Sequence, residues 1–348
     1  MSFCLTLPTP AQASDPVLQD FVFISDTQYP WTDKSDSGGA EDIEETKRRS
    51  KLFINHQALA TMEYRMEYGG LDDIPLFINV DVTAYGHGWQ RDYMYSHPFK
   101  DFYRRNFYVN LGNHDYQNNI RNGSSGCFNN GCARDMYKDM VGWAKRYPTR
   151  AFDHSSRDNG WEINEGSLAY SLVIGDVLAI QLQNEPTYSV SFESNRKTSE
   201  ISESLDFLEK ELKWAREAGK DVILNMHKPP YAHWQSAENP RFKTLMKDNE
   251  DLVLGIFAGH LHGNSGLHAR VGTIPVYLSG ASYRETFLTA YYNPRDRELF
   301  VFKVSDNDWR NNRKLVGRSK ATAPRAMPAG SRTDRSAAYS ATDLSSSR

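Results

Sequence analysis

Carboxylate, imidazole and amide side chains stand at five places along the chain, each directly after a short apolar run. These places are Asp26-Thr27-Gln28, Asp81, Gly112-Asn113-His114-Asp115, His227 and Gly259-His260-Leu261-His262. Two divalent ions held about 3.5 to 4 Å apart need a shared carboxylate together with imidazole and oxygen ligands. The five segments supply that mixture of ligands. Any one of them alone could be an ordinary loop or helix cap, but five in order indicate a metal site.

The apolar runs before these groups have the length of buried β-strands. They cover residues 21–25, 76–80, 107–111, 222–226 and 253–258. In α/β proteins, ligands bind just beyond the carboxyl ends of the strands, so the five polar segments are expected to meet at one place. The strands must therefore belong to an arrangement in which these ends lie side by side.

Helical segments alternate with the strands, which is the pattern of an α/β protein. Residues 41–68 carry Ile43, Leu52, Leu59, Met62 and Met66 at roughly helical spacing and precede Gly69-Gly70. We therefore expect a crossover helix between the first two strands. Five further strands are predicted at residues 168–172, 177–182, 276–278, 287–291 and 299–304. The last three should form a mostly antiparallel closing group.

The order and spacing of these motifs resemble those of the calcineurin-like (purple acid phosphatase-like) metallophosphoesterase family. That family is marked by D-x-H, G-D, G-N-H-[D/E], a single H and G-H-x-H. The resemblance covers about residues 20–305, and its most specific parts are Gly112 to Asp115 and Gly259 to His262. It implies an α/β fold, a four-layer αββα sandwich, with a dinuclear metal centre at the sheet edge.

The resemblance also implies a role for each polar residue. The first metal would be held by Asp26, Gln28, Asp81 and His262, and the second by Asp81, Asn113, His227 and His260. Asp81 would bridge the two ions, which could be Mn, Fe, Zn or Mg. His114 would face the scissile phosphate, and Asp115 would orient its ring.

These roles predict metal-dependent hydrolysis of a phosphoester. Two cations lower the pKa of a bridging water and so produce a hydroxide for in-line attack on phosphorus. His114 can act as the general acid that protonates the leaving alkoxide. Two alternatives stay open. One is a phospholipase C-like phosphodiesterase acting on a lipid head group, and the other is a non-catalytic binding or toxin-like module on the same scaffold.

Two positions depart from the family pattern. Gln28 stands where the family has His, which exchanges an imidazole nitrogen for an amide oxygen and favours harder ions. Val80 stands where the family has Gly before the bridging Asp81. Its β-branched side chain adds bulk beside the metals and disfavours the positive φ values that Gly permits. Both changes bear on how active the protein is.

Aromatic and basic residues follow Asp81 and His227 in the sequence and are expected at the rim of the cleft. Four basic side chains could bind a non-bridging phosphate oxygen: Arg91, Lys228, His233 and Arg284. Each could equally be an ordinary surface residue. The expected substrates are a phosphomonoester, a soluble phosphodiester or a phospholipid. The chain carries a net charge of -3, which does not favour nucleic acid as a partner.

Composition also bears on domain organisation. The chain has 348 residues, of which 24% are charged and 12% aromatic, and no apolar run of about 18 residues that could span a bilayer. We expect a monomer with one folded domain over residues 16–317. Residues 1–15 resemble a signal peptide or its remnant, with Ala11-Gln12-Ala13 as a cleavage site. Residues 318–348 are basic and rich in Ser and Ala, and are expected to be disordered.

The cysteines bear on the compartment. Cys127 and Cys132 have C-x4-C spacing in a loop rich in Gly and Asn, where a disulfide is expected in a secreted or extracytoplasmic protein. Asn122-Gly123-Ser124 in the same loop is a possible glycosylation acceptor. Two free thiols in a reducing compartment remain the alternative.

Overall fold

A computed structural model describes residues 18–79, 81–121, 127–236 and 239–324 of the chain. Several expectations therefore concern residues outside the described ranges. These are the leader at residues 1–15, Val80, the glycosylation acceptor at residues 122–124, and the tail from residue 325 onward. No helix within the described ranges is both long enough and apolar enough to cross a membrane.

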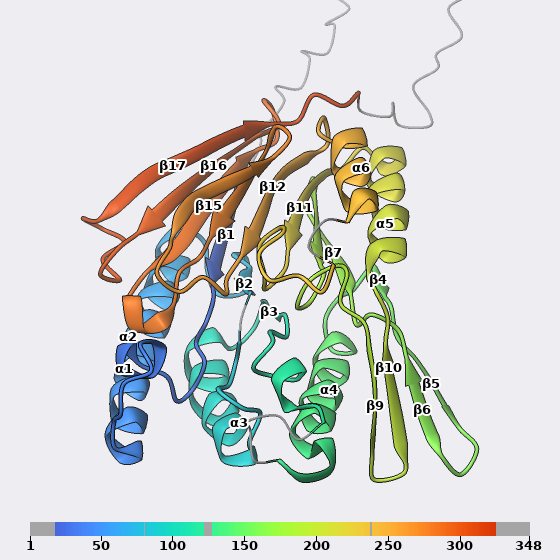
Figure 1. Cartoon of the computed structure of the whole chain (residues 1–348). Coiled ribbons are helices and arrows are strands. Elements are labelled where there is room, and N and C mark those ends of the chain that lie inside the picture. The colour runs from blue at the N-terminus through green and yellow to red at the C-terminus, as the bar shows by residue number, and fades with distance from the viewer. Residues whose placement is uncertain (1–17, 80, 122–126, 237–238, 325–348) are drawn as a thin grey trace, which may run out of the picture.

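Two β-sheets pack face to face at the centre of the molecule (Figure 1). The first has the order β17-β16-β15-β1-β2-β3, with bounds Arg313–Lys320, Glu298–Val304, Phe287–Asn293, Gln19–Ile24, Leu76–Ile78 and Phe107–Val109. The second has the order β13-β14-β12-β11-β8-β7-β4, with bounds Gly266–Val271, Ile274–Leu278, Val253–Ala258, Asp221–Asn225, Val177–Gln181, Tyr170–Ile174 and Ala151–Phe152. The rings of Phe23 and Phe257 stack across the interface with centroids 3.7 Å apart. The core therefore lies between the sheets.

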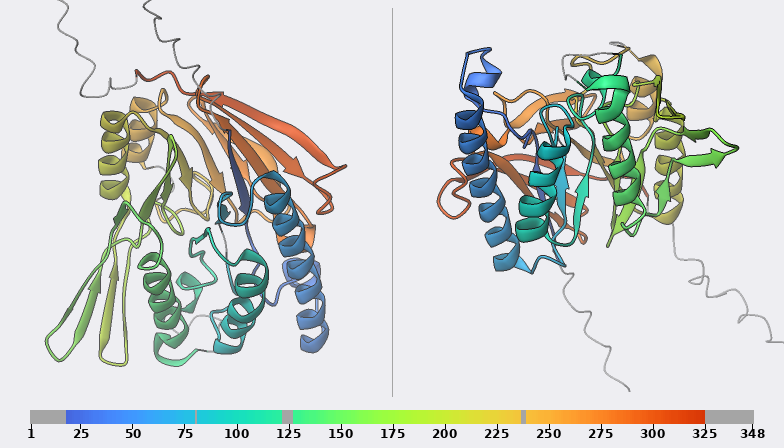
Figure 2. Two further views of the ribbon diagram at one scale, coloured as in Figure 1. Left: turned by 180° about the vertical axis from the view of Figure 1, so that it is seen from behind. Right: turned by 90° about the horizontal axis from the view of Figure 1, so that it is seen from below.

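Helices cover the outer faces of both sheets (Figures 1 and 2). Helix α2 (Ile43–Tyr68) packs against β1, whereas α5 (Leu205–Ala218) packs against β8 and β11 and α6 (Pro240–Asp248) against β13. The remaining α-helices are α1 (Asp33–Asp36), α3 (Gly88–Met94) and α4 (Gly131–Ala144). A π-helix, η1 (Tyr95–Tyr103), follows α3, and short 3₁₀ helices are η2 (Gln117–Asn119), η3 (Phe128–Asn130) and η4 (Ser282–Arg284). The order helix, sheet, sheet, helix confirms the expected layered α/β fold.

The crossover helix is present, but the apolar face assigned to it is wrong. Ile43, Leu52, Leu59 and Met66 are exposed, by 39% to 62%. The buried face of α2 instead includes Ile54, Ala58, Tyr64 and Arg65. Arg65 is buried because its guanidinium donates to the backbone carbonyls of Ile74 and Tyr103. A basic residue and several small residues thus lie on the face of α2 that packs against the sheet. The pattern of hydrophobic residues alone does not identify this buried face.

The prediction of an antiparallel closing group is only partly confirmed. Strands β15 and β16 pair antiparallel beside β1, as expected. Strand β14, however, joins the second sheet, where it lies parallel to β12. The chain changes from the second sheet to the first between β14 and β15, so these neighbours in sequence do not form one group.

A third sheet, which the sequence did not predict, projects from the body as an arm (Figure 1). Its order is β5-β6-β10-β9, with bounds Ser155–Asp158, Glu162–Glu165, Lys197–Ile201 and Val190–Ser194. All four residues of β5 are exposed. Strands of this kind lack the apolar runs by which the other strands were recognised.

The folded part of the chain continues beyond residue 318, where the sequence predicts the disordered tail to begin. Strand β17 continues to Lys320 and pairs antiparallel with β16, so that Phe300 lies opposite Arg318. The Arg318 guanidinium donates to the carboxylate of Glu298. Backbone hydrogen bonds then hold Ala321 and Ala323 against the body. An edge strand pairs through its backbone, and composition therefore says little about where such a strand ends.

The strand ends that carry the polar motifs come from both sheets. Strands β1, β2 and β3 run parallel in the first sheet, and β11 and β12 run parallel in the second. Their carboxyl ends meet near the centre of the molecule, below the labels of β1, β11 and β12 in Figure 1. The site is therefore assembled between two sheets, with each sheet supplying part of the polar residues.

Candidate metal centre

Asp26, Asp81 and His227 form the buried centre of the site. They follow β1, β2 and β11 respectively, and each is at most 2% exposed. One ligand atom from each lies within 4.8 Å of the other two. His227 Nε2 is 3.2 Å from Asp81 Oδ2, and His227 Nδ1 is 3.9 Å from Asp26 Oδ1. Two carboxylates and an imidazole so close together, and away from water, suit a multivalent cation.

Gln28 brings an unsatisfied amide into the same place. Its backbone nitrogen donates to the Asp81 carbonyl at 2.8 Å, and its φ is +38°, in the left-handed region. The side chain is fully buried, and neither amide atom finds a hydrogen-bond partner among the described residues. A buried polar group without a partner costs about 1 to 3 kcal/mol. A cation bound to the amide oxygen would remove this cost, so the chemistry of Gln28 fits a metal ligand.

The turn from Gly259 to His262 adds two imidazoles. A Cβ at Gly259 would lie 2.5 Å from the Asn79 carbonyl oxygen and 2.6 Å from Asp26 Oδ2, so only glycine fits there. The backbone nitrogen of His260 donates to Asp26 Oδ2 at 3.0 Å. His262 Nε2 lies 3.3 Å from Asp26 Oδ1. This close approach of backbone to carboxylate holds both histidines beside the cluster.

Asn113 completes the set from β3. Its Oδ1 lies 3.0 Å from His227 Nε2, the same nitrogen that faces Asp81. An amide oxygen, a carboxylate and an imidazole thus surround one point. The structure brings together Asp26, Gln28, Asp81, Asn113, His227, His260 and His262, the predicted ligand set, around Asp26 and Asp81.

The charges in the cluster shift the titration of its members. Burial raises the pKa of Asp81, but His227 and His114 outweigh it and hold that pKa well below its usual range. Burial lowers the pKa of His262, whereas the carboxylates of Asp26 and Asp36 raise it to about 9. For His260, burial and the charge of His227 lower the pKa to about 3. The carboxylates therefore attract positive charge, which a metal ion would supply in place of protons.

His114 lies at the wall of an open cleft of about 370 Å³. Its backbone nitrogen donates to Asp81 Oδ1 at 2.8 Å, and its Nδ1 lies 2.9 Å from the Ala84 carbonyl oxygen. Since a carbonyl only accepts, Nδ1 carries a proton, and Nε2 is the nitrogen available to a substrate. The Trp31 ring stands edge-on, with its centroid 5.1 Å from that of His114. The cleft is lined by Trp31, Asp36, Asp81, His114, His260, Leu261, His262, Gly263 and Asn264.

Asp115 does not orient the His114 ring, contrary to expectation. Its carboxylate accepts hydrogen bonds from the backbone nitrogens of Val82, Thr83 and Gly112 and from the Thr83 hydroxyl. Burial, and after it the charge of Asp81, raise the pKa of Asp115 to about 7, and these backbone donors oppose the shift. Asp115 therefore fixes the loop that carries Asp81, and the Ala84 carbonyl orients His114.

The four basic residues predicted at the rim have different surroundings. Arg91 is not available to a phosphate, because its guanidinium pairs with Asp135 at 3.1 Å and Asp139 at 2.6 Å on α4. Lys228 is 4% exposed, and its Nζ donates to Gln117 Oε1 at 2.9 Å and to the His233 carbonyl at 3.1 Å. Arg91 thus joins α3 to α4, whereas Lys228, the residue after His227, holds its buried amine between Gln117 and His233.

His233 and Arg284 lie beside the predicted ligands. His233 Nδ1 is 2.8 Å from His260 Nε2, so the other ring nitrogen of His260, Nδ1, is the one free to bind a metal. Arg284 is exposed, and its guanidinium lies 5.0 Å from the centre of the Tyr283 ring. The Tyr283 hydroxyl in turn donates to Asp36 Oδ2 at 2.7 Å.

Sequence reasoning missed three asparagines that connect the strands below the site. Asn110 Nδ2 donates to Asn79 Oδ1, and Asn79 Nδ2 donates to Asn225 Oδ1, each at 3.1 Å. The series joins β3, β2 and β11. A signal was present, because Asn stands two residues before Asp81, before Gly112 and before His227. Asp36 was also missed, and no spacing in the sequence points to it.

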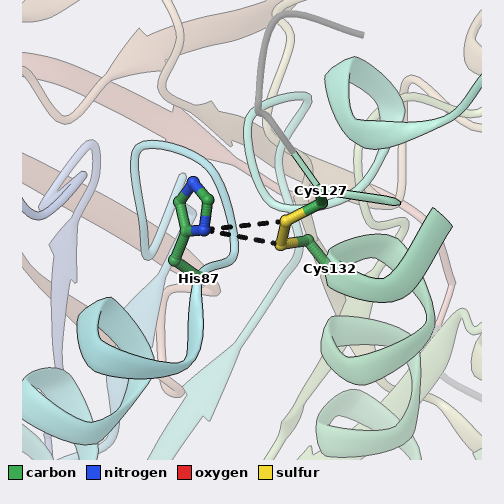
Figure 3. Close-up of side chains that lie close together, drawn as sticks. All are labelled: His87, Cys127 and Cys132. Carbon is green, nitrogen blue, oxygen red and sulfur yellow. Dashed lines mark hydrogen bonds between the residues drawn. A yellow bond between two sulfur atoms is a disulfide. The ribbon is translucent and has the colours of Figure 1, made fainter. Parts of the chain in front are cut away.

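Cys127 and Cys132 lie together at the start of α4, with Cα atoms 5.8 Å apart and their sulfur atoms joined (Figure 3). This agrees with the pairing expected from the C-x4-C spacing. The joined pair connects η3 to the first turn of α4, next to the loop that leads into α3.

Comparison with known proteins gives one family and several related folds. A family model described as calcineurin-like phosphoesterase matches residues 20–264. No curated protein matches the sequence significantly. Among solved structures, a dimetal phosphatase from Danio rerio is 16% identical, covers 88% of this chain and 99% of its own, and has a TM-score of 0.49. GAP50, the anchor in the inner membrane complex of Plasmodium, is 11% identical, with coverages of 88% and 90% and a TM-score of 0.47.

Proposed function

Because the chain belongs to the calcineurin-like phosphoesterase family, we propose that it hydrolyses a phosphoester at a centre of two divalent metal ions. The observation that carries this proposal is the buried cluster of Asp26, Asp81 and His227, with the unpartnered amide of Gln28 beside it. Such a cluster of charge has no role in packing, since buried carboxylates need cations as partners.

We assign the ligands to the two ions as the family resemblance implies. Asp26, Gln28 and His262 would hold the first ion, whereas Asn113, His227 and His260 would hold the second. Asp81 would be shared by both. When bound, the two ions would polarise the phosphoryl oxygens and lower the pKa of a water molecule between them. Gln28 and Asn113 give each ion an oxygen ligand, which favours Mn, Mg or Fe over softer ions.

His114 is the residue proposed to protonate the leaving group. Its Nδ1 proton is held by the Ala84 carbonyl, so a second proton on Nε2 would face the cleft. An imidazolium in that position can donate to a leaving alkoxide, which contributes typically 10²- to 10⁴-fold to the rate. The Trp31 ring packs against the His114 ring in a T-shaped arrangement.

Lys228 would add positive charge without touching the substrate. Its amine is buried between two neutral oxygen acceptors, and burial lowers its pKa. Its charge offsets part of the negative charge of Glu185 and Asp81. Arg284, exposed beside Tyr283, is the basic side chain best placed to approach a substrate from the solvent side.

We test the proposal by assaying the purified chain with Mn, Mg, Zn and Fe(II) on phosphomonoesters, soluble phosphodiesters and phospholipid vesicles. Turnover that requires an added divalent ion, and that falls by about 10²- to 10⁴-fold in His114→Ala, is expected. His97→Ala is the matched control, because His97 is an exposed histidine whose described partners, Asp101 and Tyr93, are not among the proposed site residues. Metal binding without turnover on any substrate would instead support a non-catalytic binding module.

The cysteine pair bears on the compartment. We propose that the protein acts outside the cytoplasm, where the pair Cys127–Cys132 would stay oxidised. We also propose that it acts as a monomer. Recovery of the protein from the extracytoplasmic fraction tests the location, and mass spectrometry of protein alkylated before lysis tests the cysteine pair. Absence from that fraction, or two alkylated thiols in it, would contradict the proposal.

A further inference from the structure

A histidine that is not one of the proposed phosphoesterase residues stands directly against the cysteine pair. The Tyr85 ring lies 6.2 Å from the rings of both this histidine, His87, and His114. His87 precedes α3, and its Nδ1 lies 3.7 Å from Cys127 Sγ and 3.9 Å from Cys132 Sγ (Figure 3). One ligand atom from each of the three residues lies within 4.8 Å of the others. None of them belongs to the set around Asp81, which contains no sulfur.

These distances are close to those that a zinc ion imposes on its ligands. With Zn–S bonds of about 2.3 Å and Zn–N bonds of about 2.0 to 2.1 Å, tetrahedral angles place the nitrogen about 3.6 Å from each sulfur. The observed separations exceed this value by a few tenths of an ångström. To bind an ion, the two sulfurs only need to separate to about 3.8 Å. Only the spacing of the two sulfurs therefore has to change for the three residues to share a cation.

The local structure favours thiolates and leaves a route for an ion to enter. Cys132 lies in the first turn of α4, where the helix dipole stabilises negative charge on a thiol. His87 is fixed by the Gln90 side chain, which accepts from the backbone nitrogens of Tyr85 at 2.9 Å and His87 at 3.3 Å. Cys132 is buried, but His87 and Cys127 are half-buried, so the cluster is open to solvent on one side.

We propose that, once the disulfide is reduced, Cys127, Cys132 and His87 form a second metal site that binds one Zn²⁺, with solvent as the fourth ligand. A dithiol reductant breaks the S–S bond, supplies two electrons and two protons, and becomes a disulfide itself. Zn²⁺ then displaces the two thiol protons. Two thiolates, an imidazole and an open position form a known type of zinc coordination. The same three residues thus carry a disulfide in oxidising surroundings and an ion in reducing ones.

Cobalt is the probe that separates this site from the phosphoesterase centre. Co²⁺ bound to thiolates gives a sulfur-to-metal charge-transfer band in the near ultraviolet, and Co²⁺ bound to oxygen and nitrogen alone does not. The full chain carrying Cys4→Ser, which removes the third cysteine, is reduced with dithiothreitol, desalted without oxygen and titrated with Co²⁺. We expect a band whose final intensity corresponds to one thiolate-bound ion per chain, and which Zn²⁺ added in excess of all three proposed positions removes by binding in its place. The oxidised chain should show no band.

Variants test the ligands one by one. Cys127→Ser and Cys132→Ser should each lose most of the band. His87→Ala should weaken Co²⁺ binding by more than the roughly 10- to 100-fold typical of second-shell changes, and His97→Ala should leave it unchanged. Circular dichroism checks that each variant is folded. No band in the reduced chain, or equal affinity in His87→Ala, would overturn the proposal. Loss of hydrolysis in Asp81→Asn with the band retained would show that the two sites are independent.

Discussion

His262 Nδ1 lies 2.6 Å from Asp36 Oδ1, although the two residues are 226 positions apart in the sequence. The other nitrogen of the ring faces Asp26, at 3.3 Å from its Oδ1. Asp36 and Asp26 thus contact opposite nitrogens of one imidazole. In metal sites such a carboxylate fixes the tautomer of the ligand histidine and increases its basicity.

We therefore predict that Asp36→Asn weakens binding at the first metal position by about 10- to 100-fold. Circular dichroism should show an unchanged fold, because Asp36 lies at the surface in the short helix α1. Calorimetric titration with Mn²⁺ measures the effect. Asp33→Asn, in the same helix but paired with Arg49 away from the site, is the control. Equal affinity in Asp36→Asn and wild type would mean that Asp36 does not support the ligand.

Asp81→Asn should abolish both activity and tight metal binding. Asp81 is the carboxylate proposed to be shared, so its loss removes charge from two coordination shells at once. Metal content after gel filtration, measured by elemental analysis, is the readout. Asp72→Asn, at an exposed position, should keep both ions. Two tightly bound ions per chain in Asp81→Asn would refute the shared role.

The sequence predicted that most of the proposed ligands lie together because each of them follows a buried strand. Asp26, Asp81 and His227 follow strands that are recognisable as apolar runs. The backbone of each strand fixes where the residues just after it lie. The prediction failed where the partner comes from elsewhere in the chain. Asp36 lies on a four-residue helix without any apolar pattern, so nothing local connects it to His262.

The roles of charged residues were harder to predict than their positions. Arg91 follows Asp81 closely in the sequence, but two aspartates on α4 bind its guanidinium and hold it away from the cleft. The buried face of α2 was also predicted wrongly from its apolar side chains. Arg65 lies on that face, and backbone carbonyls accept its hydrogen bonds. In both cases a tertiary partner decides the outcome, and sequence spacing contains no information about that partner.

In the absence of metal, stability should fall as the pH rises from about 6.5 to about 9. The carboxylates of Asp26 and Asp36 raise the pKa of His262 to about 9, against an ordinary value of about 6.5. A raised pKa stabilises the folded state fully below the unfolded value, and this contribution is lost as the pH rises through the folded value. The shift corresponds to at most about 3 kcal/mol.

Urea unfolding in the presence of a chelator, at pH 6 and pH 9.5, measures this loss. His262→Gln should show a smaller difference between the two pH values, whereas His268→Gln, on an exposed part of β13, should behave as wild type. With saturating metal the dependence should disappear, since the bound ion takes the place of the proton. A chelated wild type that is equally stable at both pH values would contradict the prediction.

Asp115→Asn separates the structural role of Asp115 from the orienting role that the family resemblance implied. The carboxylate accepts from three backbone nitrogens and one hydroxyl, all on the loops that carry Asp81 and Asn113. In the variant, an amide N–H would face one of these donors, and a buried donor left unpaired costs about 1 to 3 kcal/mol. We therefore expect lower unfolding free energy and weaker Mn²⁺ binding.

The pH dependence of kcat on the acid-catalysis side should stay unchanged, because the Ala84 carbonyl holds the His114 ring. If unfolding free energy and metal affinity were instead unchanged while that side of the pH profile shifted, Asp115 would act through His114, and the role assigned to Ala84 would be wrong.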